Sequence, residues 1–219
     1  MSIFDIMGPV MVGPSSSHTA GACRLGLVAG NLMGEKIVAA KINLFGSFLL
    51  TGRGHGTDKA LVAGLLGFKT DDLRIPDSFK YAKEEGLTFE FGEARLKEAN
   101  PNTVEFILTG ESDRVLEVVG SSIGGGRINI EKIDGIITNF SGDYPTLIIR
   151  IFDQPGHVAE VTSMLASKEI NIANMQMYRN MRGGEAVMVI ECDQEVPDEC
   201  ITWLKKVDGV KDAAYLSLS

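Results

Sequence analysis

The sequence predicts an α+β protein built from two domains, residues 1–143 and 144–219. The early part of the chain alternates helical and strand periodicity, and a run of strand-like segments separated by glycines follows it. The last third has the predicted order βαββαβ, which is typical of a ferredoxin-like fold. We therefore expect a first domain with its helices early and an antiparallel meander late, followed by a small ferredoxin-like domain.

The first helix is preceded by a loop rich in hydroxyl groups, residues 13–21, with the sequence G-P-S-S-S-H-T-A-G. Four apolar residues follow it at helical spacing: Leu25, Val28, Ala29 and Leu32. This spacing predicts a helix that starts near Thr19, with Ser17 or Thr19 as the N-cap. The unpaired amide groups of the first turn, together with the hydroxyls of Ser15 and Ser16, would hold a small anion such as a carboxylate.

A second loop of the same style, residues 51–58, has the sequence T-G-R-G-H-G-T-D. A strand over 36–45 precedes it and an apolar helix over 59–66 follows, so a ligand is expected at the carboxyl end of that strand. Thr57 is the predicted N-cap, and the glycines leave His55 unshielded at the positive end of a helix, which favours its neutral form. Each loop alone also fits a purely structural turn, but two histidine loops before two helices favour a binding site.

The remaining elements of the first domain are a short helix and mostly strands. The segments expected are a helix at 77–85 and strands at 87–91, 102–109, 114–123, 127–133 and 136–140. Because a strand rather than a helix follows the glycine triplet 124–126, we interpret the triplet as a bulge or wide hairpin and not as a phosphate loop. The polar stretch 141–145 is the expected linker.

The second domain is predicted element by element from its apolar periodicity. Strands are expected at 147–152, 170–180, 186–192 and 210–218, and helices at 158–168 and 198–206. The turn 153–157 joins the first strand to the first helix, so Gly156 and His157 would lie at a helix N-terminus that can receive a carboxylate.

Composition limits the function. With 21 basic and 29 acidic side chains the net charge is −8 and no basic cluster occurs, which argues against nucleic acid or an anionic membrane as the partner. No apolar run is long enough to span a membrane and no leader pattern is present, so we expect a cytoplasmic protein. The three cysteines, Cys23, Cys192 and Cys200, lack C-x-x-C spacing, and we expect no metal site on this chain.

The two loops resemble signatures of the iron-sulfur-dependent L-serine dehydratases. G-P-S-S-S-H-T-A-G, G-R-G-H-G-T-D-K-A and the opening stretch Ser2–Pro9 all fit that family. The resemblance implies the beta subunit of the two-subunit form, which converts L-serine to pyruvate and ammonia. It also implies an allosteric-substrate-binding-like first domain and a separate alpha subunit that carries a 4Fe-4S cluster.

Within that resemblance, His55 is the expected base that removes the Cα proton, and His18 is the weaker candidate for the same role. The expected substrate-binding residues are Ser15, Ser16, Ser17, Thr19 and Gly54. Fixed hydrogen-bond donors in these loops would stabilise charge that spreads into the carboxylate as the proton leaves.

The second domain resembles the ACT regulatory domain, on the basis of D-Q-P-G-H after its first strand and I-N-I-A-N-M in its second. Such domains typically bind an amino acid where two of them pair, which implies a homodimer. The effector contacts would fall on Asp153, Gly156, His157, Asn171 and Asn174. The alternative function is a stand-alone amino-acid-binding regulatory protein without catalytic activity, which the scattered cysteines favour and the His55 loop disfavours.

Overall fold

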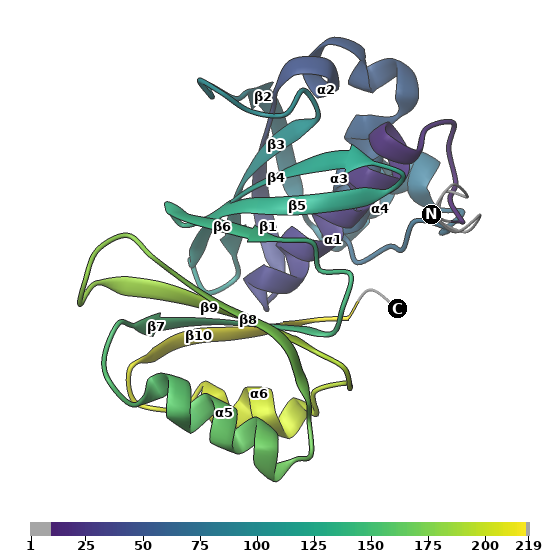
Figure 1. Cartoon of the computed structure of the whole chain (residues 1–219). Helices are drawn as coiled ribbons and strands as arrows, with labels where there is room; N and C mark the ends of the chain where they lie inside the picture. Colours follow the sequence, from purple (N-terminus) through teal and green to yellow (C-terminus); the bar gives the residue numbers. More distant parts are fainter. Residues whose placement is uncertain (1–9, 218–219) are drawn as a thin grey trace. The chain divides into compact units, whose positions relative to one another are not determined.

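The computed structural model describes residues 10–217, and the elements divide into two units, of which the first ends at Asp134 and the second begins at Gly135 (Figure 1). The opening stretch Ser2–Pro9 lies outside the described residues. The predicted α+β class is confirmed: each unit contains one sheet and helices. The domain boundary expected after Asp143 stays a prediction.

The first unit begins with a π-helical turn, Ser16–Gly21, that continues into α1 (Ala22–Met33). The elements that follow are β1 (Ile37–Leu44), α2 (Gly46–Thr51), a 3-10 turn (Gly52–His55), α3 (Thr57–Leu65), a second 3-10 turn (Ile75–Asp77), α4 (Ser78–Glu85), β2 (Thr88–Glu93), β3 (Thr103–Gly110), β4 (Val115–Gly124) and β5 (Arg127–Ile133). A short helix, α2, therefore lies between β1 and the second histidine loop.

The strands of the first unit lie in the order β2-β1-β3-β4-β5. β2 pairs with β1 in parallel, and the other neighbours are antiparallel. The glycine triplet forms the hairpin between β4 and β5, and all three glycines have positive φ, which explains why glycine is needed there. The predicted meander is thus confirmed for β3, β4 and β5.

The second unit has the predicted ferredoxin-like order. After β6 (Ile136–Phe140) come β7 (Thr146–Phe152), α5 (His157–Ser167), β8 (Ile172–Arg179), β9 (Glu185–Cys192), α6 (Asp198–Leu204) and β10 (Val210–Leu216). The sheet order is β10-β7-β9-β8 with antiparallel neighbours, and α5 and α6 lie on one face of it (Figure 1). The core between them is apolar, with Ile149, Leu165, Met188 and Leu204 fully buried.

Glycines bring α1 and α3 into backbone contact. A β-carbon at Gly26 of α1 would lie 2.2 Å from the carbonyl oxygen of Leu61, and one at Gly64 of α3 would lie 2.1 Å from that of Cys23. The two helices therefore cross one or two turns after they begin, with their N-termini on the same side. No helix among the described residues is long and apolar enough to cross a membrane.

This crossing predicts that Gly26→Ala lowers the free energy of unfolding by about 1–3 kcal/mol, because the added methyl overpacks a backbone contact that cannot move aside. Gly30→Ala is the matched control on the same helix, since its β-carbon would come no closer than 3.3 Å to another atom. Both changes replace glycine by alanine, whose higher helix propensity favours the helix by about 1 kcal/mol. Urea unfolding of the two variants measures the difference, and equal midpoints would contradict the close crossing.

Candidate functional site

The two histidine loops meet beyond the carboxyl end of β1. The chain leaves β1 at Leu44, forms α2 and the 3-10 turn, and enters α3 at Thr57. The π-helical turn at the start of α1 packs against this segment and against β4. π-Helical turns are rare and are frequently found at functional sites.

The N-caps differ from those predicted. Ser15 is the N-cap of the first turn, and its hydroxyl accepts a hydrogen bond of 3.0 Å from the amide of His18. The prediction of Ser17 or Thr19 was wrong because the helix begins earlier, at Ser16, in π form. The prediction of Thr57 as N-cap was also wrong. Thr57 is the first residue of α3, and the N-cap is Gly56, in left-handed conformation.

His18 and His55 form a pair, with ring centroids 5.0 Å apart. Nε2 of His18 lies 3.0 Å from Oγ of Ser47 and 3.2 Å from Oγ1 of Thr51, so two hydroxyls of α2 hold this ring. The buried ring of Phe48 contacts His18 edge-on, at 5.4 Å between centroids. His18 is therefore fixed from several sides, while His55 is exposed.

Hydrogen bonds to backbone carbonyls orient the second loop. Nδ1 of His55 lies 3.2 Å from the carbonyl oxygen of Thr51. A carbonyl oxygen only accepts, so Nδ1 carries a hydrogen, and in the neutral form of His55 the basic nitrogen is Nε2. The hydroxyl of Thr19 donates to the carbonyl oxygen of His55 at 3.2 Å and ties the two loops together. An imidazole oriented in this way can take up a proton at Nε2 when that nitrogen is unprotonated.

Burial, and after it the charge of the neighbouring His55, lowers the pKa of His18 below its ordinary 6.5. Protonation of His18 is thus less favourable in the folded chain than in the unfolded one. The stability that depends on this group is present above pH 6.5 and is lost as the pH falls through the lower folded value. At neutral pH the pair consequently contains a neutral His18.

A cavity of about 250 Å³ lies beside His55. Among the described residues, its lining includes three of the predicted site residues, Thr19, Gly54 and His55. Ser15, Ser16, Ser17 and His18 do not line it. The structure therefore brings both loops together but turns the three serines of the first loop away from this cavity.

Several residues of the site were missed by the sequence analysis. The rest of the lining consists of Val12, Gly13 and Pro14 before the first turn, Gly56 and Lys59 at the start of α3, and Ile75 and Pro76 after α3. The signal for Lys59 was its spacing of four residues from His55. Nothing in the local sequence indicated that Ile75 and Pro76 would line the cavity. Their position depends on how the loop between α3 and α4 folds.

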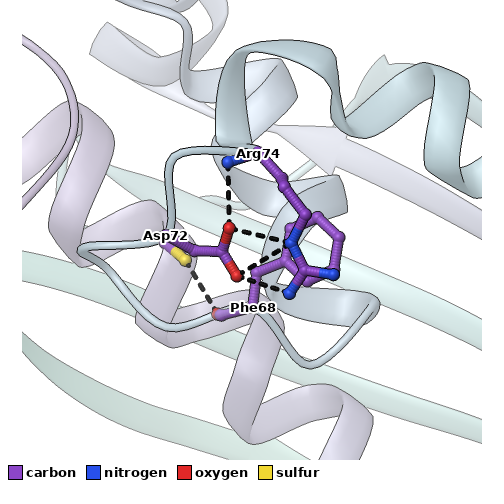
Figure 2. Close-up of polar contacts among 4 residues, drawn as sticks. Phe68, Asp72 and Arg74 are labelled. Carbon is purple, nitrogen blue, oxygen red and sulfur yellow. Dashed lines mark hydrogen bonds and ion pairs between the residues drawn. The ribbon is translucent and has the colours of Figure 1, made fainter.

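The loop between α3 and α4 is held by an ion pair within it and by an aromatic ring. Figure 2 shows the Asp72 carboxylate bound to the guanidinium of Arg74, which lies over the ring of Phe68 at 4.0 Å from its centroid. Hydrogen bonds from Arg74 hold the pKa of the Asp72 carboxyl below its ordinary value. Next to this cluster, Thr70 accepts a hydrogen bond of 2.8 Å from the amide of Val12. The loop thereby positions both the Ile75 side and the Val12 side of the cavity.

The cysteines do not fit a 4Fe-4S cluster, which needs several converging thiolates. Cys23 lies in the first unit, whereas Cys192 and Cys200 lie in the second, and all three are buried. Burial raises the pKa of Cys23 to about 12 and that of Cys192 to about 11, so both remain protonated thiols. Within residues 10–217, no three His, Cys, Asp or Glu side chains are grouped as a metal site.

The predicted effector residues lie at opposite ends of the second sheet. Asp153, Gly156 and His157 follow the end of β7, where Phe152 pairs with Glu185. Asn171 and Asn174 lie where β8 begins, near Cys192 at the other end of β9. One copy of the chain therefore does not bring these residues together.

Most of these residues already have partners in the protein. The Asp153 carboxylate binds Arg179 at 2.7 Å and accepts from the amide of Gly183, and these bonds lower its pKa. Side-chain amides of the two asparagines donate to carboxylates, Asn171 to Asp193 and Asn174 to Glu191. In contrast, Nε2 of His157 is buried without a hydrogen-bond partner.

Comparisons with known proteins place the chain in a family. Residues 2–86, which contain both histidine loops, match the family described as Serine dehydratase beta chain. The chain is 40% identical over 209 residues to a probable L-serine dehydratase, beta chain, of Bacillus subtilis, covering 95% of this chain and 94% of that protein. It is 38% identical over 218 residues to the L-serine dehydratase, beta chain, of Peptoniphilus asaccharolyticus, covering 99% and 98%.

A more distant similarity involves part of the chain. A D-3-phosphoglycerate dehydrogenase of Methanocaldococcus jannaschii is 36% identical over 112 residues, which is 51% of this chain and 21% of that protein. The two beta chains, in contrast, align with this protein from end to end. The chain therefore belongs to the family of L-serine dehydratase beta chains.

Proposed function

We propose that this chain is the beta subunit of an L-serine dehydratase, which converts L-serine to pyruvate and ammonia together with a cluster-bearing alpha subunit. The observation that carries the proposal is the orientation of His55. Its Nδ1 donates to the Thr51 carbonyl, so Nε2 is the nitrogen that can act as a base, in a loop that lines a cavity. A non-catalytic amino-acid sensor, the alternative function, needs hydrogen-bond donors but no such base.

His55 removes the Cα proton of serine in this proposal. The carbonyl of Thr51 stabilises the imidazolium that forms, because the Nδ1–H remains directed at it while Nε2 takes the proton. Ser47 and Thr51 hold the ring of His18, whose centroid lies 5.0 Å from that of His55. His18 thereby keeps the ring of His55 in place. Gly54 leaves the approach open, since no atom lies within 4 Å of the position of its missing β-carbon.

The cluster belongs to the alpha subunit in this proposal, because the three thiols of this chain are buried, protonated and divided between the two units. We derive no step of the reaction through it. The partner subunit would cover the exposed His55 and complete the site. The absence of a basic patch and the reduced thiols fit a cytoplasmic enzyme that binds neither nucleic acid nor membrane.

The second unit acts as an ACT domain that pairs with a second copy. Because Asp153, Gly156 and His157 lie at the opposite end of the sheet from Asn171 and Asn174, an effector site that uses both sets needs two chains. The exposed edge strand β8, with Met175 and Met177 partly exposed on it, is available for that pairing.

Because the alpha subunit carries the cluster in this proposal, we predict that the chain purified alone is colourless and inactive on L-serine. Activity should appear when the alpha subunit, sought in an adjacent reading frame rich in cysteine, is added under anaerobic conditions. Pyruvate formation measures it. Robust turnover by the isolated chain would contradict the proposal.

The base assignment predicts that His55→Gln lowers kcat by about 100-fold or more, the usual contribution of general base catalysis, with little change in KM. His18→Gln is the matched control, because it removes an imidazole from the same pair without removing the free base. We expect it to raise KM more than it lowers kcat. A nearly unchanged kcat in His55→Gln would show a structural role only.

Pairing through the second unit predicts a concentration-dependent dimer of the isolated chain that L-serine stabilises. Sedimentation velocity with and without L-serine measures this. A monomer at every concentration, unaffected by L-serine, would remove the support for the ACT assignment.

A further inference from the structure

The cavity beside His55 contains one side chain with a permanent charge among its described lining residues, Lys59. The rest of the lining consists of apolar side chains, glycine backbone, Thr19 and His55. Lys59 is exposed to solvent, so its charge is accessible to a ligand that enters the cavity. The chemistry of the cavity therefore favours a small ligand that carries a negative group.

The position of Lys59 is set by the start of α3. Gly56, in left-handed conformation at φ +71°, turns the chain from His55 into the helix, and Lys59 is the third residue of that helix. The carbonyl oxygen of Lys59 accepts a hydrogen bond of 2.8 Å from the hydroxyl of Ser78. The backbone is thus fixed on one side, while Lys59, four residues after His55, is among the residues that line the same cavity.

The side-chain donors of Thr19 and His55 in the lining are already in use. The hydroxyl of Thr19 donates to the carbonyl of His55, and Nδ1 of His55 donates to the carbonyl of Thr51. No carboxylate within residues 10–217 forms an ion pair with Lys59. Its ammonium therefore offers up to three hydrogen-bond donors to a ligand.

We infer that Nζ of Lys59 binds the carboxylate of the amino-acid substrate and so determines specificity at this site, an inference that rests on the proposed function. The ammonium attracts the carboxylate of the zwitterion and repels its amino group, so the substrate has one preferred orientation. The carboxylate points to α3, and Cα lies toward His55. When the Cα proton moves to His55, negative charge spreads into the carboxylate that Lys59 holds.

The test uses the complete alpha–beta complex with the variants Lys59→Met, which keeps length and removes charge, and Lys59→Arg, which keeps the charge. Lys80→Met, on the exposed face of α4, is the control for loss of a surface lysine. Steady-state kinetics with L-serine are combined with inhibition by L-alanine and by L-alaninamide, which lack the hydroxyl and differ only in the carboxylate. Co-purification with the alpha subunit and circular dichroism verify that each variant is folded and assembled.

We expect Lys59→Met to raise KM for L-serine about 10- to 100-fold, the range typical of one hydrogen bond to a charged group, and to lower kcat less. It should weaken inhibition by L-alanine by a similar factor and leave L-alaninamide unchanged, and Lys59→Arg should restore part of the preference. If the wild-type complex turns over L-serine but Lys59→Met leaves KM and the inhibition by L-alanine unchanged, the role of Lys59 is overturned and the proposed function is not. A wild-type complex without activity on L-serine would instead overturn the proposed function, and this inference with it.

Discussion

The close crossing of α1 and α3 is the constraint on which the site depends. Gly26 and Gly64 let the two backbones touch, and the contact lies within two turns of both helix N-termini. The loops that carry His18 and His55 are the N-terminal extensions of these helices. Once the helices are packed this closely, the loops have to meet, and the two rings lie 5.0 Å apart.

Backbone carbonyls then decide the chemistry of the loops. The carbonyl of Thr51 fixes the tautomer of His55, and the carbonyl of His55 takes the hydroxyl hydrogen of Thr19. The first bond makes Nε2 the nitrogen of His55 that can act as a base, and His55 and Lys59 both line the cavity. Burial, and after it the charge of His55, lowers the pKa of His18, so the ring of His18 is mainly neutral at neutral pH.

Much of the fold could be predicted from the sequence, because apolar periodicity and glycine positions are local signals. The βαββαβ order of the second unit and the hairpin at Gly124–Gly126 are examples. The cap at Ser15 could not be predicted, since nothing in the sequence distinguishes a π-helical first turn from an α-helical one. Lys59 was missed for another reason: the loop with Ile75 and Pro76 makes it a cavity residue, and that loop is placed by tertiary contacts of Thr70 and Arg74.

The central claim is that His55 of this chain takes the Cα proton of serine. The most direct test is the rate at which the complete complex removes deuterium from Cα-deuterated L-serine, compared between wild type, His55→Gln and His18→Gln. The account predicts loss of deuterium in wild type, a rate at least about 100-fold lower in His55→Gln, and continued loss in His18→Gln. Continued deuterium loss in His55→Gln, with loss abolished in His18→Gln, would contradict it and exchange the roles of the two histidines.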